Sequence, residues 1–168
     1  GRPITCCFTG HRPGKLPWGF NEADPRCTAL KRKIADAVDS AYQSGYRHFI
    51  CGMAQGCDFY FAEAVLALRA RCGGVTLEAA VPCPEQAASW PRRDQTRYQA
   101  LLAACDFETL VQEHYSPGCM QRRNRYMVDH SALIIAVYDG LPGGTRQTLE
   151  YAIRQKVDFV DIHPEGTP

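Results

Sequence analysis

The chain has 168 residues, a length that fits one domain with a hydrophobic core of its own. Its 19 lysines and arginines nearly balance 18 acidic residues, and a formal net charge of +1 gives no sign of a polyanion-binding protein. No apolar run approaches the roughly 20 residues that span a bilayer, and no signal peptide is visible, so we expect no membrane partner.

Nine cysteines are a high and odd number for this length. None forms a C-x-x-C pair. Zinc sites need closely spaced ligand pairs, and disulfide frameworks belong to small secreted domains. We therefore interpret the cysteines as small apolar residues in a reducing cytoplasm. The sequence predicts no metal site and no cofactor.

The first half of the chain alternates between strands and helices. Residues 4–8 form a short apolar run that predicts a buried strand, and a loop rich in proline and glycine follows. Asp24 is placed as the N-cap of the first helix, with Pro25 at its first position, which is a typical helix start. Residues 47–51 predict the second strand, and a turn with two glycines joins it to a helical pattern over residues 58–72.

The alternation continues in the second half. Residues 75–81 predict the third strand, and two prolines then break the chain before a short predicted helix that contains Gln86 and Trp90. Three further elements follow: a helix over residues 94–104, a weak strand over residues 107–111 and a helix over residues 120–130.

The most informative stretch begins with a continuous apolar run over residues 132–138, which is typical of a strand buried on both faces. Pro142-Gly143-Gly144-Thr145 follows and opens a helix whose predicted inner face carries Leu149, Ala152 and Ile153. Backbone N–H groups in a glycine turn can approach a ligand closely, and the helix dipole favours negative charge. We expect this turn to bind the phosphate of a nucleotide-like ligand.

The alternation ends with a short strand over residues 159–162 and predicts an α/β protein. We expect a single domain over residues 1–168, with a mostly parallel central sheet and helices on both faces. In such sheets ligands bind beyond the carboxyl ends of the strands, where the strand order reverses. Neither G-x-G-x-x-G after the first strand nor G-x-x-x-x-G-K-[ST] is present, which argues against a standard dinucleotide dehydrogenase and a P-loop ATPase.

Glycines and polar residues follow four of the predicted strands. They are Gly10, His11 and Arg12 after the first strand, Gly52, Gln55, Gly56 and Asp58 after the second, Gln86 and Trp90 after the third, and Asp139, Gly143, Gly144 and Thr145 after the fifth. A tight turn would explain any one of the glycines. Three glycine-bearing turns on one rim favour a site for phosphate or ribose.

Each candidate also has a purely structural interpretation. Trp90 either stacks on a base or fills the core, and Asp58 either binds a ribose hydroxyl or caps the helix that it begins. His11 and Arg12 either contact phosphate or form ordinary polar surface. The run Arg122-Arg123-Asn124-Arg125 is either a phosphate clamp or a solvated helix face. At least one of its arginines must point outwards, because three within four residues cannot share one face.

The sequence Phe-Ile-Cys-Gly-Met-Ala-Gln-Gly-Cys-Asp over residues 49–58, followed by Ala62-Glu63-Ala64, resembles the G-x-A-x-G-x-D turn of the SLOG superfamily. That group has a Rossmann-like fold and includes the DprA/Smf proteins and the "lonely guy" (LOG) phosphoribohydrolases. Its YpsA-like branch is more similar still, over nearly the whole chain. The matching segments are Thr9 to Pro13, Gln86 with Trp90, Arg97-Tyr98, Ala104 to Asp106, Arg123-Asn124 and Gly143 to Thr145. The resemblance implies a Rossmann-like, three-layer domain that binds a nucleotide ligand and pairs as a homodimer through its helices.

The resemblance to the LOG enzymes also implies two catalytic positions. Those enzymes use an arginine on the helix before the strand and a glutamate in P-G-G-x-G-T-x-x-E to hydrolyse the N-glycosidic bond of a nucleoside monophosphate. Arg123 and Glu150 fall at these positions. A carboxylate can stabilise an oxocarbenium-like centre, and an arginine can hold phosphate bidentately. The structural alternatives are a solvated charge for Glu150 and a surface ion pair for Arg123.

The loop departs from the enzyme pattern, because Gly143-Gly144-Thr145-Arg146-Gln147-Thr148 lacks the third glycine. This departure favours binding over catalysis. We therefore expect a sensor or regulatory module that binds a nucleotide or nucleotide-derived small molecule. The alternative is a phosphoribohydrolase that acts on nucleoside monophosphates. A third hypothesis is DprA-like binding of single-stranded DNA, and the near-neutral charge counts against it because phosphate neutralisation drives such binding.

Overall fold

The computed structural model describes residues 2–165, and its centre is a six-stranded sheet in which all strands run parallel. The strands are β1 (Thr5–Thr9), β2 (His48–Cys51), β3 (Thr76–Val81), β4 (Phe107–Leu110), β5 (Leu133–Val137) and β6 (Asp158–Ile162). They lie side by side in the order β4-β3-β2-β1-β5-β6. The prediction of a parallel sheet is confirmed.

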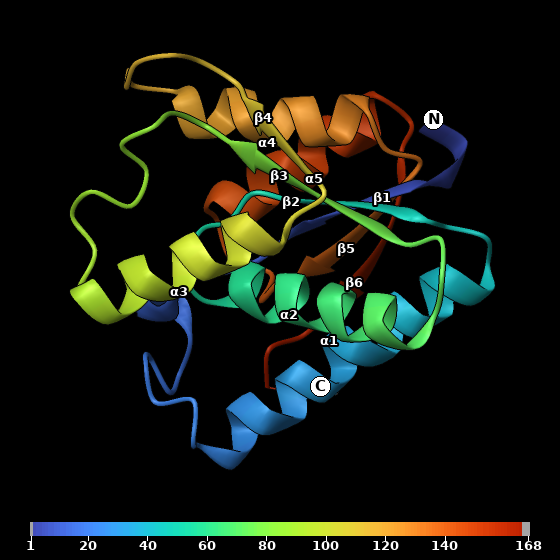
Figure 1. The fold of residues 1–168 in the computed structure, drawn as a ribbon, viewed down its shortest axis with the longest axis horizontal. Helices are drawn as coiled ribbons and strands as arrows, with labels where there is room; N and C mark the ends of the chain where they lie inside the picture. The colour runs from blue at the N-terminus through green and yellow to red at the C-terminus, as the bar shows by residue number, and fades with distance from the viewer. Residues whose placement is uncertain (1, 166–168) are drawn as a thin grey trace.

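Helices cover both faces of this sheet. They are α1 (Pro25–Gln43), α2 (Cys57–Arg71), α3 (Arg92–Ala104), α4 (Cys119–Asp129) and α5 (Gly144–Arg154). Figure 1 shows α1, α2 and α3 on one face and α4 with α5 on the other. The protein is therefore a three-layer α/β structure of the Rossmann-like class, as the sequence predicted.

The side chains of β1 serve two cores, one on each face. Cys6 and Phe8 belong to the larger core under α1, α2 and α3, whereas Cys7 belongs to the smaller core under α4 and α5. Phe8 stacks on Phe61 of α2 with the ring centroids 4.7 Å apart. Successive strand side chains point to opposite faces, so a strand buried on both faces is apolar at nearly every position.

The strand order reverses between β1 and β5. From β1 the chain moves outward through β2, β3 and β4, and it then returns to place β5 and β6 on the other side of β1. The carboxyl ends of β1 and β5 therefore flank the position at which open parallel sheets bind their ligands.

The starts of α1 and α2 can be compared with the helix caps that the sequence predicts. Asp24 caps α1 as predicted, and its Oδ1 accepts a hydrogen bond from Arg26 N at 2.8 Å. In contrast, α2 begins earlier than predicted, with Gly56 as its N-cap. Asp58 lies inside the first turn, where its Oδ2 accepts from Ala54 N at 3.0 Å. Asp58 therefore holds the preceding turn and is not a helix cap.

Two predictions about local structure were wrong. The segment with Gln86 and Trp90 forms hydrogen-bonded turns and not a helix, because prolines on both sides leave room only for short i→i+3 bonds such as Trp90 N to Ala87 O at 3.1 Å. Ile153 does not face inwards and is 61% exposed. The buried side of α5 consists of Thr145, Thr148, Leu149 and Ala152, and Ile153 falls beyond its edge.

Seven of the nine cysteines are buried, in keeping with their interpretation as small apolar residues. Burial raises the pKa of several of these thiols, including those of Cys7 and Cys51. Within residues 2–165 no helix has the length and apolar character needed to cross a membrane.

Candidate functional site

A pocket of about 400 Å³ opens between the carboxyl end of β1 and the start of α5, the helix that follows β5, on the side of the sheet where the strand order reverses. Three segments form most of it: the loop after β1, one side of α4 and the first turn of α5. Several of the sequence-predicted residues line it together, namely Gly10, His11, Arg12, Asp58, Arg123, Asn124, Gly144 and Thr145. We refer to this hollow as the switch-point pocket.

Positive groups surround the entrance to α5. The N-cap of this helix is Gly143, and the first N–H groups of a helix have no acceptor within it, so they favour an anion. Arg12 and Lys15, both exposed, line the pocket opposite this helix end. Lys15 Nζ also donates to Pro142 O at 3.3 Å, which ties the loop after β1 to the loop before α5. A Cβ added at Gly144 would meet no described atom within 4 Å, so this residue borders open space.

Arg123 lies at the base of the pocket and is only 4% exposed. Its Nη1 donates to the main-chain oxygen of Gly52 at 2.5 Å and to Gln86 Oε1 at 3.3 Å, and its Nε donates to Asn124 Oδ1 at 2.8 Å. Nη2 has no oxygen acceptor among residues 2–165 and lies 3.8 Å from the Met120 sulfur. The alternative of a surface ion pair for Arg123 is excluded, because the side chain is buried and most of its guanidinium is bonded to the protein itself.

Asp58 and Arg123 are both buried in the wall of the pocket. Burial raises the pKa of Asp58, and the nearby Arg123 charge opposes that rise. Burial likewise lowers the pKa of Arg123, and Asp58 opposes that change. Arg122 and Arg125 are exposed, so the prediction that at least one arginine of this run points outwards is confirmed.

His11 connects the loops after β1 and β5. Its Nε2 accepts a hydrogen bond from Asp139 N at 3.2 Å, so this ring nitrogen carries no proton in the arrangement seen. Burial lowers the pKa of His11, which favours the neutral ring, although Asp139 Oδ1 at 3.4 Å acts in the opposite direction. Asp139 Oδ1 also accepts from Leu141 N at 2.9 Å and shapes the loop that leads to α5.

Three predicted ligand-binding glycines pack against the protein itself. A Cβ at Gly52 would lie 2.6 Å from Arg123 Nη1, and one at Gly10 would lie 2.8 Å from Cys57 Cβ. Gly56 has a φ of +84° and faces the His11 carbonyl oxygen, 2.9 Å from the position of an added Cβ. These positions need glycine for close packing and chain geometry, without reference to a ligand.

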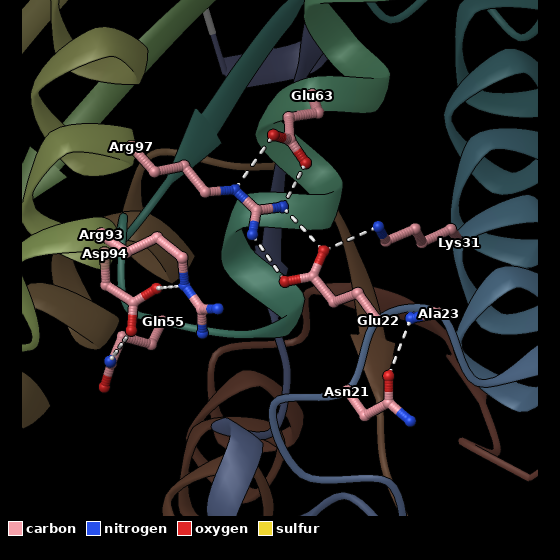
Figure 2. Close-up of polar contacts among 9 residues, drawn as sticks. All are labelled: Asn21, Glu22, Ala23, Lys31, Gln55, Glu63, Arg93, Asp94 and Arg97. Atoms are coloured by element: carbon pink, nitrogen blue, oxygen red, sulfur yellow. Dashed lines mark hydrogen bonds and ion pairs between the residues drawn. The ribbon is translucent and has the colours of Figure 1, made fainter.

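Further predicted residues lie outside the pocket lining. Trp90 packs edge-on against Phe59 and Tyr98, with ring centroids 5.9 and 5.3 Å away, in the manner of a core residue. Gln55 Nε2 donates to Asp94 Oδ2 of α3 at 2.8 Å, as Figure 2 shows. Gln86 Nε2 donates to Gly52 O at 3.3 Å.

Glu150 lies in a separate, adjoining hollow between α4 and α5. Its side chain is 55% exposed, and its carboxylate pairs with Arg146 Nε at 3.8 Å. The structure therefore does not bring Glu150 and Arg123 into one pocket lining.

Sequence reasoning missed several lining residues: Lys15, Met120, Gln121, Met127 and Gln147. Helical spacing was an available signal for Gln147, which follows Gly144 by three residues and so shares its side of α5. Lys15 gave no such signal, because its place depends on how the loop after β1 folds back. Among the described residues no group of three or more His, Cys, Asp or Glu side chains is arranged to hold a metal ion.

The fold and the pocket define a Rossmann-like α/β protein with an anion-suited site at the reversal of strand order. A family model described as the YspA SLOG family (YpsA) matches residues 6–162, and the chain belongs to this family. It is similar to the uncharacterized SPbeta prophage-derived protein YoqJ of Bacillus subtilis, with 33% identity over 143 residues that cover 77% of this chain and 83% of YoqJ. A UPF0398 protein of Bacillus pumilus is 23% identical over 155 residues, which cover 91% of this chain and 81% of that protein.

Two solved structures of DNA processing protein A (DprA) share the fold. The protein from Streptococcus pneumoniae superposes with a TM-score of 0.61 at 17% identity, over 96% of this chain and 50% of that one. The protein from Helicobacter pylori, described for its single-stranded DNA binding mode, gives 0.63 at 14% identity, over 96% and 66%. The chain thus spans half of one DprA and just under two thirds of the other, and the likeness shows the fold alone.

Proposed function

We propose that this chain is a nucleotide-ligand-binding domain that acts as a sensor or regulatory module, with its ligand in the switch-point pocket. One observation carries the proposal: the N-terminus of α5, Arg12 and Lys15 border the same hollow of about 400 Å³. That volume lies within the roughly 300–1,000 Å³ of small-molecule sites. A cytoplasmic location and a helix-paired homodimer belong to the same proposal.

The distribution of charge supports a phosphate as the anchoring group. Arg12 and Lys15 are exposed cations on a loop that the Lys15–Pro142 and His11–Asp139 contacts hold close to α5. His11 remains available as a neutral, hydrogen-bonding ring. Asp58 introduces the one carboxylate among the lining residues, and it suits a ribose hydroxyl more than a phosphate. The arrangement therefore favours a phosphorylated nucleoside over a free base.

The test is binding of the four ribonucleoside 5′-monophosphates and the four matching nucleosides, measured by calorimetry and thermal shift. We expect at least one monophosphate to bind and its nucleoside to bind at least about 10-fold more weakly. The variant Arg12→Ala should weaken the monophosphate, whereas Arg122→Ala, an exposed arginine of α4 outside the pocket lining, should not. Absence of binding to all eight compounds, and to the corresponding 5′-diphosphates and 3′,5′-bisphosphates, would remove the proposed function.

A second candidate is hydrolysis of a nucleoside monophosphate. It is favoured by the Glu150 carboxylate, which is exposed in the hollow next to the pocket and not engaged in a close ion pair. Incubation with the same four monophosphates and detection of free base tests this reaction. If base is released, Glu150→Gln should abolish the release while leaving nucleotide binding intact. No release from any of the four excludes this reaction on these substrates.

The fold shared with DprA also supports a test of single-stranded DNA binding. Binding of a labelled oligothymidylate measured at rising salt would answer the question, because contacts with the DNA backbone weaken steeply with salt. DNA binding that competes with a mononucleotide would place both ligands in the same pocket.

A further inference from the structure

The hollow that contains Glu150 forms a groove between α4 and α5 with a volume of about 270 Å³. Gln121, Asn124 and Gln147 line both this α4–α5 groove and the switch-point pocket. The two hollows therefore adjoin, and these three side chains lie at their boundary.

The boundary is held by one side-chain hydrogen bond. Gln121 Nε2 of α4 donates to Gln147 Oε1 of α5 at 3.0 Å. Both glutamines are exposed, so a ligand can replace this bond without opening the core. Asn124 Oδ1 accepts from Arg123 Nε, which leaves the Asn124 NH2 group to donate to a ligand near the boundary.

In the far part of the groove two arginines pack on one aromatic ring. The guanidinium carbons of Arg125 and Arg154 lie 4.9 and 5.7 Å from the Tyr151 ring centroid. The Tyr151 hydroxyl donates to Asp129 Oδ1 at 2.6 Å, which fixes the orientation of the ring. Arg125 and Arg154 line the groove together with one lining carboxylate, Glu150, and an arginine can hold a phosphate bidentately.

From this geometry, and resting on the proposed function, we infer that the α4–α5 groove is the second half of the ligand site and binds a second phosphate group. The groove alone is smaller than most ligand sites, whereas the pocket and groove together match a nucleotide with two phosphates.

The helix geometry specifies which kind of bisphosphate fits. Gly144 and Arg154 are separated by ten residues of α5, or roughly 15 Å of helix axis, and the arginine side chain leans back toward the N-terminus. Adjacent phosphates of a 5′-diphosphate are too close together to reach both ends. The ligand class is therefore a nucleotide whose phosphates are separated by a ribose, as in a nucleoside 3′,5′-bisphosphate.

The experiment compares the four ribonucleoside 5′-monophosphates with the four 3′,5′-bisphosphates and the four 5′-diphosphates on the full chain. We expect the best bisphosphate to bind at least about 10-fold more tightly than its monophosphate, as a charge-assisted hydrogen bond allows. The increase in affinity over the monophosphate should be smaller for the 5′-diphosphate. The double variant Arg125→Ala, Arg154→Ala should bind the bisphosphate no more tightly than the monophosphate and leave monophosphate binding unchanged. The Arg122→Ala variant should retain the higher affinity for the bisphosphate.

The outcomes separate this inference from the proposed function. If monophosphates bind and bisphosphates gain nothing, or if the gain survives in the double variant, the groove is not a second phosphate site although the pocket still binds nucleotides. If no nucleotide of any class binds, the proposed function and this inference are both wrong. All three arginines are exposed, so these variants retain the buried core.

Discussion

Arg123 of α4 donates a hydrogen bond to the main-chain oxygen of Gly52, 2.5 Å away, and so closes the carboxyl end of β2. An arginine that serves mainly as a phosphate clamp would present its guanidinium to solvent. This one is buried and bonded to Gln86 and Asn124 as well. Its first role is to hold the turn after β2 in place, and its Nη2 is the part left to face a ligand.

Substitution of Arg123 by alanine should therefore destabilise the protein. The change removes the closer of the two donors to the Gly52 oxygen, leaves the Gln86 and Asn124 side-chain oxygens without the Arg123 donor, and takes a cation away from the buried Asp58. Loss of hydrogen bonds from a buried charged group to buried partners costs about 1–3 kcal/mol. Urea unfolding measures the loss, and Arg122→Ala should stay within about 0.5 kcal/mol of the parent. A loss as small as that of Arg122→Ala would show that the guanidinium is not structural.

Substitution of Asp58 tests whether its charge and that of Arg123 stabilise each other. Asp58→Asn removes the buried negative charge, so the double variant Arg123→Ala, Asp58→Asn should lose less stability than the sum of the two single losses. Purely additive losses would mean that the two side chains act independently. For the variants that remain folded, we expect Arg123→Ala to weaken phosphate-bearing ligands more than free nucleosides, and an equal loss for both would remove Arg123 from phosphate binding.

The glycines give a matched pair of substitutions. Gly56→Ala requires a φ of +84° that alanine rarely adopts and places a Cβ 2.9 Å from the His11 carbonyl oxygen, so we expect a loss of at least about 2 kcal/mol. Gly144→Ala points into open space at the start of a helix, so its stability should be unchanged or slightly higher. Gly144→Ala should nevertheless weaken nucleotide binding, because its methyl group narrows the pocket. Unchanged binding in Gly144→Ala and in the bulkier Gly144→Val would count against the switch-point pocket.

A second pair of glycines, Gly52 and Gly144, shows which part of the site the sequence could not predict. Gly52 and Gly144 both follow a buried strand, and their neighbours in the sequence do not distinguish them. Whether the space beside the α-carbon is filled by Arg123 or left open is decided by packing between distant segments. The rule that ligands bind beyond the strand ends located the pocket, but it could not separate residues that face a ligand from those that face the protein.

The fold was easier to predict than the site, because a buried strand or a helix start can be recognised from neighbouring residues in the sequence. The run that became β5 is apolar at successive positions since helices cover both faces of the strand, and Asp24 with Pro25 marked the start of α1 by chemistry within two residues. The prediction of a helix around Trp90 was wrong because the conformation of this segment depends on contacts with distant residues. Trp90 packs against Phe59 of α2 and Tyr98 of α3, and such contacts between elements require no helix in the segment.

Glu78 of β3 predicts how stability changes in acid. Its carboxylate accepts hydrogen bonds from Tyr126 OH at 2.6 Å and Thr109 Oγ1 at 2.8 Å, and it lies 2.7 Å from His48 Nε2. Burial would raise the pKa of Glu78, but the contacts with His48, Tyr126 and Thr109 outweigh burial and lower the pKa from 4.5 to about 2. Its stabilising contribution is thus complete above pH 4.5 and is lost as the pH falls toward 2.

The difference between the two pKa values corresponds to about 3 kcal/mol at neutral pH. Urea unfolding at intervals from pH 7 to pH 2.5 should therefore show a loss of stability below pH 4.5 that is smaller in Glu78→Gln. The same variant should be less stable than the parent at pH 7, and the gap should narrow with acid. Parallel curves for the two proteins would mean that other carboxylates account for the acid sensitivity.

Arg97 of α3 joins three segments through two carboxylates, as Figure 2 shows. Its Nη1 donates to Glu22 at 2.6 Å and its Nη2 donates to Glu63 of α2 at 2.7 Å, so it fixes the long loop before α1 against α2 and α3. Lysine cannot reproduce this forked geometry, so Arg97→Lys should lose about 1–2 kcal/mol of stability, a loss limited by the partial exposure of the carboxylates. Thermal unfolding at low salt and at 1 M salt measures it, with Arg92→Lys on the exposed side of α3 as the control, and salt should reduce the difference. Equal stability of the two lysine variants would show that the network contributes nothing to holding this loop.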